Sequence, residues 1–406
     1  MNPIRVLRSD RLRALGAALL LALAACGGGV ESGGTGPTGS AFVEGPITGF
    51  GSVIVQGIRF DDGASLIEDA DGGAFSRDSL RLGMVVEVES SRPVDDGSGG
   101  RNATAQRVRV GGSLVGPLEA VTPGGTFIRV LGQTVRLTQA TVFEGIAGGV
   151  AGLTPGVDVL EVHGFPNPEF AVADLVATRV DKRGGAPAQF RVRGIARDLS
   201  VSGTPPTVRI GDAVFDLSGI AAPGLADGSL VRLRVGTTQV AGRWPVIAAA
   251  AESRRLDDRD EAEIEGLVTS LDTQRSFSVN GIPVDASNAT LPATALALGT
   301  RVEVQGRAGN GVLVASSVEL RTDNDVFNEG IDLRGPLSGL NRGATTFVLR
   351  GVTIFYGTVP PPLYEPSGTG EGNLQDGACV RVRARLDADR VRVLATRIEF
   401  RNNCGP

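Results

Sequence analysis

A glycine pattern that recurs five times constrains the fold of this chain more than any other feature of its sequence. Each unit opens with a glycine in a short strand, and these glycines are Gly45, Gly116, Gly194, Gly266 and Gly335. A second strand then ends at another glycine, at Gly57, Gly132, Gly211, Gly281 and Gly351. Glycine adopts positive φ without steric cost, so each second glycine predicts a tight hairpin. A period of about 70 residues predicts a string of small domains.

The rest of each unit predicts three more strands. A short apolar strand follows the hairpin, and a less regular connection leads to an alternating segment such as LGMVVEV at 82–88 or LGTRVEV at 298–304. Alternation with period two is typical of a half-buried strand. A last strand, such as ATAQRVRV at 103–110, closes the unit. The order and the long third connection match the five-stranded Greek-key OB barrel, with a β-meander or small sandwich as the alternative.

We therefore predict an all-β protein, a tandem array of about five small five-stranded OB-like β-barrels after a signal peptide and a flexible tether. The best candidate for a helix in the long connection is ATALAL at 293–298. The predicted segments are a signal peptide at 1–25, a Gly-rich tether at 26–42, and repeats at 43–112, 113–185, 190–256, 262–323 and 330–406.

The N-terminal segment predicts an envelope location. Four arginines precede an apolar run at 15–25, which is too short to be a permanent membrane span. The run ends in LAAC at 23–26, which resembles the bacterial lipobox, so we expect Cys26 to be acylated and to bind the membrane. An ordinary signal peptide with a chance cysteine is the alternative. Gly28 after the cysteine favours the outer membrane, with the protein facing the periplasm or the cell surface.

The repeated motif resembles a known family. The pattern G-x-I/V, V-N-G-I/V and L-x-x-G-x-x-V-x-V-x-G on a lipobox-tethered chain resembles the DUF5666 domain of bacterial lipoproteins. The clearest copies lie at 45–110 and 266–320, and the repeats together cover about 43–400. Repeat 3 departs most, because AAP at 221–223 and AAAA at 248–251 replace expected features. The family is a domain of unknown function, so the resemblance implies no reaction or ligand.

Composition excludes several classes of protein. The chain has 40 basic and 45 acidic residues, with a formal net charge of −5, so no basic domain is available and we expect no nucleic-acid partner. Aromatic residues make up only 4%. One His and three Cys are too few for a zinc domain or a disulfide-dense scaffold. We expect no cofactor and no metal site.

Catalytic signatures are absent from the sequence, and we expect no enzymatic activity. His163 is the single histidine, and we expect it to be a polar residue at the end of a strand. No G-x-S-x-G motif occurs. Acid clusters at 61–62, 68–71, 257–261 and 323–325 leave open a weak calcium site or a carboxylate-based hydrolase, but solvated loops are the simpler interpretation.

The recurring phenylalanines and the remaining cysteines have structural interpretations. Phe127, Phe277 and Phe347 recur just before the hairpin glycine and predict a core position, with a stacking platform as the alternative. Cys379 and Cys404 are a disulfide candidate, because the envelope is oxidising; two separate thiols are the alternative. A hairpin turn near 387–390 would place Cys379 opposite residue 398, so the tail would have to fold back.

These observations favour a lipid-anchored envelope protein that acts as a non-catalytic binding or scaffold module, with an envelope protein or a glycan as partner. The alternative is a polysaccharide or peptidoglycan hydrolase that uses carboxylates. A third interpretation is a purely structural role, in which the barrels are a spacer that holds something away from the membrane.

Overall fold

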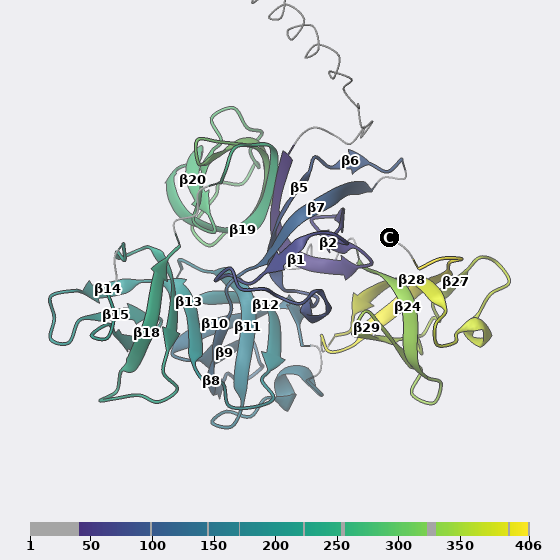
Figure 1. Cartoon of the computed structure of the whole chain (residues 1–406), viewed down its shortest axis with the longest axis horizontal. Coiled ribbons are helices and arrows are strands. Elements are labelled where there is room, and N and C mark those ends of the chain that lie inside the picture. The colour runs from purple at the N-terminus through teal and green to yellow at the C-terminus, as the bar shows by residue number, and fades with distance from the viewer. Residues whose placement is uncertain are drawn as a thin grey trace, which may run out of the picture. The chain divides into compact units, whose positions relative to one another are not determined.

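A computed structural model describes residues 40–404, apart from 98–99, 144–145, 170, 222–223, 253–255, 323–329 and 389. Over these residues the chain is all-β and forms five closed barrels, numbered 1 to 5 in chain order (Figure 1). The predicted signal peptide, the lipobox with Cys26 and nearly all of the tether lie outside the described residues. Among the described residues, no helix has the length and apolar character to cross a membrane.

Barrel 1 shows the topology that all five share. Its strands are β1 (Ser40–Phe50), β2 (Val53–Val55), β3 (Ile58–Asp61), β4 (Leu66–Glu68), β5 (Val85–Ser91), β6 (Val94–Asp95) and β7 (Arg101–Val110). The antiparallel run β1–β2–β3 continues with β7 parallel to β3. β5 then pairs antiparallel with both β7 and β1 and closes the barrel. This is the OB order, so the prediction of OB-like barrels is confirmed and the meander and sandwich alternatives are wrong.

The other four barrels repeat this order. Barrel 2 holds β8 (Leu114–Val121), β9 (Phe127–Val130), β10 (Gln133–Val142), β11 (Val159–Pro166) and β12 (Leu175–Lys182). Barrel 3 holds β13 (Phe190–Ile195), β14 (Arg197–Ser200), β15 (Thr207–Ile210), β16 (Ala213–Asp216), β17 (Leu230–Val235) and β18 (Trp244–Ala251). Barrel 4 holds β19 (Arg259–Thr273), β20 (Ser276–Val279), β21 (Ile282–Asp285), β22 (Arg301–Gly309) and β23 (Val312–Leu320). Barrel 5 holds β24 (Ile331–Asn341), β25 (Thr346–Leu349), β26 (Val352–Phe355), β27 (Leu363–Glu365), β28 (Cys379–Leu386) and β29 (Val393–Phe400).

The hairpin glycines adopt the positive φ that the sequence predicts. In barrels 1, 2, 4 and 5 the two turn residues between the second and third strands both have positive φ, as at Asn280 (51°) and Gly281 (82°). This is the type I′ geometry whose twist matches that of the flanking strands. In barrel 3 the turn begins with Gly211, whose φ is 60°.

A β-bulge on the last strand explains the glycine that ends the V-x-V-x-G motif. In all five barrels the register between the fourth and fifth strands shifts by one residue at the equivalent place. A Cβ added at Gly164 or Gly306 would lie 2.2 or 2.1 Å from a carbonyl oxygen of the fifth strand. Glycine therefore allows the close approach at the bulge, and the bulge bends the strand as a small barrel requires.

The long third connection does not contain the predicted helix. Residues 293–298 form bends and irregular structure. In the described connections of barrels 1, 2 and 5 the helical elements are short 3₁₀ turns, at Arg77–Ser79, Gly149–Gly152 and Glu371–Asn373. The apolar residue Leu296 is instead buried in the core of barrel 4. A segment this short has too few backbone hydrogen bonds to form a helix unless packing favours one.

Hydrogen bonds between strands also connect separate barrels. β1 pairs parallel with β19 of barrel 4, with Ala41 opposite Glu261 and Glu44 opposite Ile264. Arg101 of barrel 1 also forms an ion pair with Glu263 of barrel 4, with Nη2 of the arginine 2.6 Å from Oε2 of the glutamate. We call this contact the barrel 1–4 seam.

Candidate functional site

Four arginines face one another across two adjacent strands of barrel 3. Arg191 and Arg193 lie on β13, and Arg232 and Arg234 lie directly opposite on β17, as the pairs Arg191–Arg234 and Arg193–Arg232. We call this set the arginine ladder and each pair a rung. Like charges directly opposite on a sheet destabilise it unless a counter-charge is near. The sequence contains the pattern from which this set could have been recognised. FRVRGI at 190–195 and LVRLRV at 230–235 each place arginine at two alternate positions.

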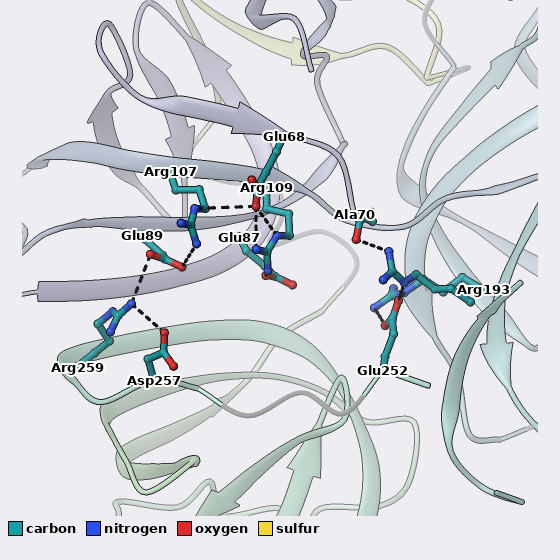
Figure 2. Close-up of polar contacts among 11 residues, drawn as sticks. Glu68, Ala70, Glu87, Glu89, Arg107, Arg109, Arg193, Glu252, Asp257 and Arg259 are labelled. Carbon is teal, nitrogen blue, oxygen red and sulfur yellow. Dashed lines mark hydrogen bonds and ion pairs between the residues drawn. The ribbon is translucent and has the colours of Figure 1, made fainter. Parts of the chain in front are cut away.

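A carboxylate of the protein bridges the rung formed by Arg193 and Arg232. Glu252 Oε2 lies 3.0 Å from Nη2 of Arg193, and Glu252 Oε1 lies 2.9 Å from Nε of Arg232. Arg232 also donates to the carbonyl oxygen of Ala70 and pairs with Asp71 at 3.0 Å. Figure 2 shows Glu252 beside Arg193, with Ala70 close to them. This rung is therefore neutralised by acids of barrels 1 and 3.

A cavity of about 410 Å³ lies on one side of this rung, and we call it cavity A. Its wall from barrel 1 carries ion pairs at Arg107–Glu89 (3.2 Å) and at Arg109–Glu68 (2.7 Å), which Figure 2 shows. Arg259 of barrel 4 pairs with Glu89 at 3.4 Å. Cavity A is polar and nearly balanced in charge.

A larger cavity, of about 560 Å³, adjoins the other rung, and we call it cavity B. Residues from barrels 1, 2 and 3 line it, among them Phe75, Met84, Glu161, Arg183, Arg191 and Arg234. Glu161 accepts hydrogen bonds from Ser113 at 2.8 Å, from Arg183 at 2.7 Å and from Arg191 at 2.5 Å. Burial raises the pKa of Glu161, but His163, Arg191, Ser113 and Arg183 outweigh burial and hold this pKa below its usual range. Glu161 is thus ionised, and its carboxylate oxygens are hydrogen-bonded to Ser113, Arg183 and Arg191.

Arg234 differs from the other three arginines of the ladder. It is exposed at the edge of cavity B, and it forms no ion pair within the described part of the chain. Ala248 of β18 lies directly beside it, as Ala250 lies beside Arg232. The alanine run at 248–251, which departs from the repeat pattern, therefore leaves space next to the ladder, and residues of this run line both cavities.

The linker between barrels 1 and 2 passes over the ladder as a pair of glycines. A Cβ on Gly112 would lie 3.0 Å from Cδ of Arg193 and 3.2 Å from Cδ of Arg232. A larger residue would displace the arginine side chains, so glycine suits this position. Gly111 and Gly112 line both cavities.

His163 is buried, contrary to the prediction of a polar residue at the end of a strand. It lies in the middle of β11, next to the bulge at Gly164, and its side chain is 3% exposed. Neither ring nitrogen has a hydrogen-bond partner among the described residues, and Nε2 lies 3.7 Å from Oε1 of Glu161. Burial lowers the pKa of His163, so the ring is neutral near pH 7. His163 lies on the same face of β11 as Glu161, and both line cavity B. Residues of barrels 1 and 3 cover this face, and strand alternation cannot show such burial.

The acid clusters serve local structure and ion pairs. Asp69 accepts backbone hydrogen bonds from Asp71 (2.9 Å) and Gly73 (2.8 Å) and so forms a turn. Asp62 pairs with Arg77 at 2.8 Å, and Glu261 pairs with Arg101 at 3.2 Å. The described residues contain no group of three or more His, Cys, Asp or Glu side chains able to hold a metal ion. The cluster at 323–325 lies outside the described residues.

The two C-terminal cysteines are joined in the structure. Cys379 and Cys404 form a disulfide with their Cα atoms 5.0 Å apart. The expected register was wrong by three residues, because the N–H of Arg401, not of residue 398, donates to the carbonyl of Cys379. The hairpin turn is longer than expected, since Leu386 pairs with Val393, and the bulge at Arg383–Ala384 adds one more residue.

The recurring aromatic residues are mostly core residues. Phe277 and Phe347 are buried, at 2% and 0% exposure. Trp244 is also buried and packs edge-on against Phe190, with ring centroids 5.6 Å apart. Phe127 is only half-buried, because the register of β9 directs Ile128 inward instead. A repeated stacking platform is therefore not formed.

Comparison with known protein families identifies the repeated unit. Residues 115–181, 265–319 and 334–399 match the family described as a domain of unknown function, DUF5666. The matched segments are barrels 2, 4 and 5. Barrel 1, which the sequence motif marks as one of the two clearest copies, is not among them. No curated protein matches this chain. Three of the five OB-type barrels thus match this domain of unknown function, which recurs along the chain.

Proposed function

We propose that this chain is a lipid-anchored protein of the bacterial cell envelope and acts as a non-catalytic binding module. The observation that carries the proposal is the pair of cavities beside the arginine ladder, where barrels 1, 2, 3 and 4 contribute side chains. Concave sites with a few convergent polar groups are where proteins usually bind ligands. The acylated Cys26 would attach these barrels to the outer membrane through the tether.

The hydrolase alternative has weaker support. Hydrolysis of glycosidic bonds needs two carboxyl groups in one cleft, one of them with a raised pKa. Burial raises the pKa of Glu263 to about 7, but Glu263 lies in the barrel 1–4 seam and lines neither cavity. The acids of cavity A, such as Glu89, are paired with arginines instead.

The anchor is tested by labelling cells with a radioactive fatty acid and separating their membranes. We expect label on the full chain in the outer-membrane fraction and none on Cys26→Ser, which should be released from the membrane. A Cys26→Ser variant that stays membrane-bound and labelled would contradict the anchor.

The binding role is tested by crosslinking the full chain in intact cells. We expect a reproducible partner, protein or glycan, that is lost in a Gly112→Leu variant, because leucine at 112 would displace the arginine ladder. A matched Gly309→Leu variant should keep the partner, because a Cβ at 309 meets no atom within 4 Å. Polysaccharide hydrolysis by the wild type that disappears in Glu89→Gln would instead favour the enzyme.

A further inference from the structure

The two rungs of the arginine ladder differ in one respect that points to a ligand. Glu252 binds across Arg193 and Arg232, with contacts of 3.0 and 2.9 Å. On the other rung Glu161 reaches Arg191, and its oxygens are also occupied by Ser113 and Arg183. Arg234 forms no ion pair among the described residues, so this rung lacks the bridging carboxylate that its neighbour has.

Space is present where that bridging group would lie. The rung continues onto β18 at Ala248, whose side chain is a single methyl group. Cavity B opens beside it with a volume of about 560 Å³, within the range of sites that hold small organic molecules. The protein itself thus shows, one rung away, how a carboxylate binds to this arrangement of arginines.

The remaining walls of cavity B set the character of the rest of the ligand. Phe75 and Met84 of barrel 1 contribute apolar surface to cavity B, and the alanines of β18 add more. Arg183, whose side chain is half-exposed, adds a further cation to the arginines of the ladder in the same cavity. A ligand with an anionic head and an apolar body matches both walls.

We infer that cavity B binds a small organic anion, whose carboxylate or phosphate bridges Arg191 and Arg234 as Glu252 bridges Arg193 and Arg232. The apolar part of the ligand packs against Phe75, Met84 and Ala248. Arginine suits this role because its planar fork binds carboxylate and phosphate oxygens in pairs. The inference rests on the proposed binding function and names the ligand class of the same site.

The test is calorimetric titration of the full chain in detergent micelles at low salt. The probes are 4-phenylbutyrate, phenyl phosphate, inorganic phosphate and the neutral alcohol 4-phenylbutanol. We expect one equivalent of phenylbutyrate or phenyl phosphate to bind, and the tighter of the two identifies the head group. Inorganic phosphate and phenylbutanol should bind at least tenfold more weakly, because each lacks one half of the ligand.

Three variants locate the binding site. Arg234→Gln should weaken the affinity about tenfold through the loss of a charge-assisted contact. Ala248→Leu should abolish binding by filling the cavity. Arg307→Gln is the matched control, because Arg307 is an exposed arginine on the corresponding strand of barrel 4 and lines neither cavity; it should bind like the wild type.

Several results would overturn the inference. These are the absence of binding for both aromatic anions, equal binding of the neutral alcohol, or an Arg234→Gln variant that binds like the wild type. If the anions fail to bind while crosslinking in cells still finds a partner that depends on Gly112, only the ligand class is wrong. If the anions bind and no partner is found, the ligand site stands and the partner-binding role fails.

Discussion

The side-chain amide of Asn280 covers the backbone of Gly266. Asn280 Oδ1 accepts a hydrogen bond from the N–H of Leu267 at 3.1 Å, and its Nδ2 donates to the carbonyl of Glu265 at 3.0 Å. A Cβ at Gly266 would lie 2.1 Å from that Nδ2. In the other barrels, too, the side chain that precedes the hairpin glycine lies close to the first-strand glycine, at Gln56–Gly45, Leu131–Gly116, Ile210–Gly194 and Arg350–Gly335. The first-strand glycine of each repeat therefore makes room for the side chain that precedes the hairpin glycine.

The first prediction follows from this contact. Gly266→Ala should lower the free energy of unfolding of barrel 4 by about 2–4 kcal/mol, because the added Cβ displaces a buried, hydrogen-bonded amide. Hydrogen-exchange mass spectrometry on barrel 4 peptides measures the loss. Gly309→Ala is the control, since a Cβ there meets no atom within 4 Å. Equal protection in the two variants would contradict the role of Gly266.

The second prediction concerns the pH dependence of the barrel 1–4 seam. Burial raises the pKa of Glu263 from 4.5 to about 7, despite the Arg101 guanidinium 2.6 Å away. The unfolded carboxyl ionises more easily than the folded one, so the contribution of Glu263 to stability is fully present below pH 4.5 and is lost as the pH rises through about 7. The loss is on the order of 3 kcal/mol.

Glu263→Gln should remove this part of the pH dependence, because the amide keeps the shape and does not ionise. Urea unfolding of the wild type and the variant between pH 4.5 and 8 measures the difference. Asp272→Asn, an exposed position on the same strand, should leave the pH profile unchanged. Parallel profiles for the wild type and Glu263→Gln would show that Glu263 is not the responsible group.

The third prediction concerns the disulfide between Cys379 and Cys404. Alkylation of the unreduced full chain should label neither cysteine, and peptide mass spectrometry checks this. The double variant with serine at both positions should destabilise barrel 5 by about 3 kcal/mol, because a 25-residue separation closes a loop of moderate length. Label on both cysteines would disprove the pairing.

The fourth prediction tests the rung that Glu252 neutralises. Glu252→Gln should cost about 3 kcal/mol, because it leaves the buried Arg193 opposite Arg232 without its carboxylate. Asp212→Asn removes an exposed ion pair with Arg129 and should cost less than about 1 kcal/mol. Thermal unfolding compares the two. Added phenyl phosphate should raise the melting temperature of Glu252→Gln more than that of the wild type; an equal rise would contradict the equivalence of the rungs.

Local patterns predicted the barrels well, because they act over a few residues. The hairpin glycines and the strand order appear in the structure as expected. In LGTRVEV at 298–304, Val302 and Val304 lie in the core as the alternation predicts, but Arg301 and Glu303 are buried as well, so the strand is not half-buried there. The helix at 293–298 was a wrong prediction. A short apolar segment can bury a side chain such as Leu296 in the core from an irregular loop as well as from a helix. His163 was misplaced because neighbouring barrels cover its face of β11, and Phe127 because Ile128, one residue later, occupies the core position.

The candidate site was not predicted, although its residues were visible in the sequence. The alternating arginines of 190–195 and 230–235 and the alanines of 248–251 are local features. Their meaning depends on which strand lies beside which, and that pairing joins residues about 40 positions apart. Ala70 of barrel 1 lies 162 positions from Arg232, and Glu161 of barrel 2 lies 30 positions from Arg191.

The sequence by itself determined that this is an all-β chain of repeated OB-like barrels, because glycine spacing and period-two alternation fix hairpins and strand faces locally. Only the tertiary structure decided that four arginines form two rungs, that Glu252 neutralises one of them and that a cavity opens beside the other. Charge and space at a site depend on contacts between distant segments, and such contacts are set by strand register and by packing between barrels.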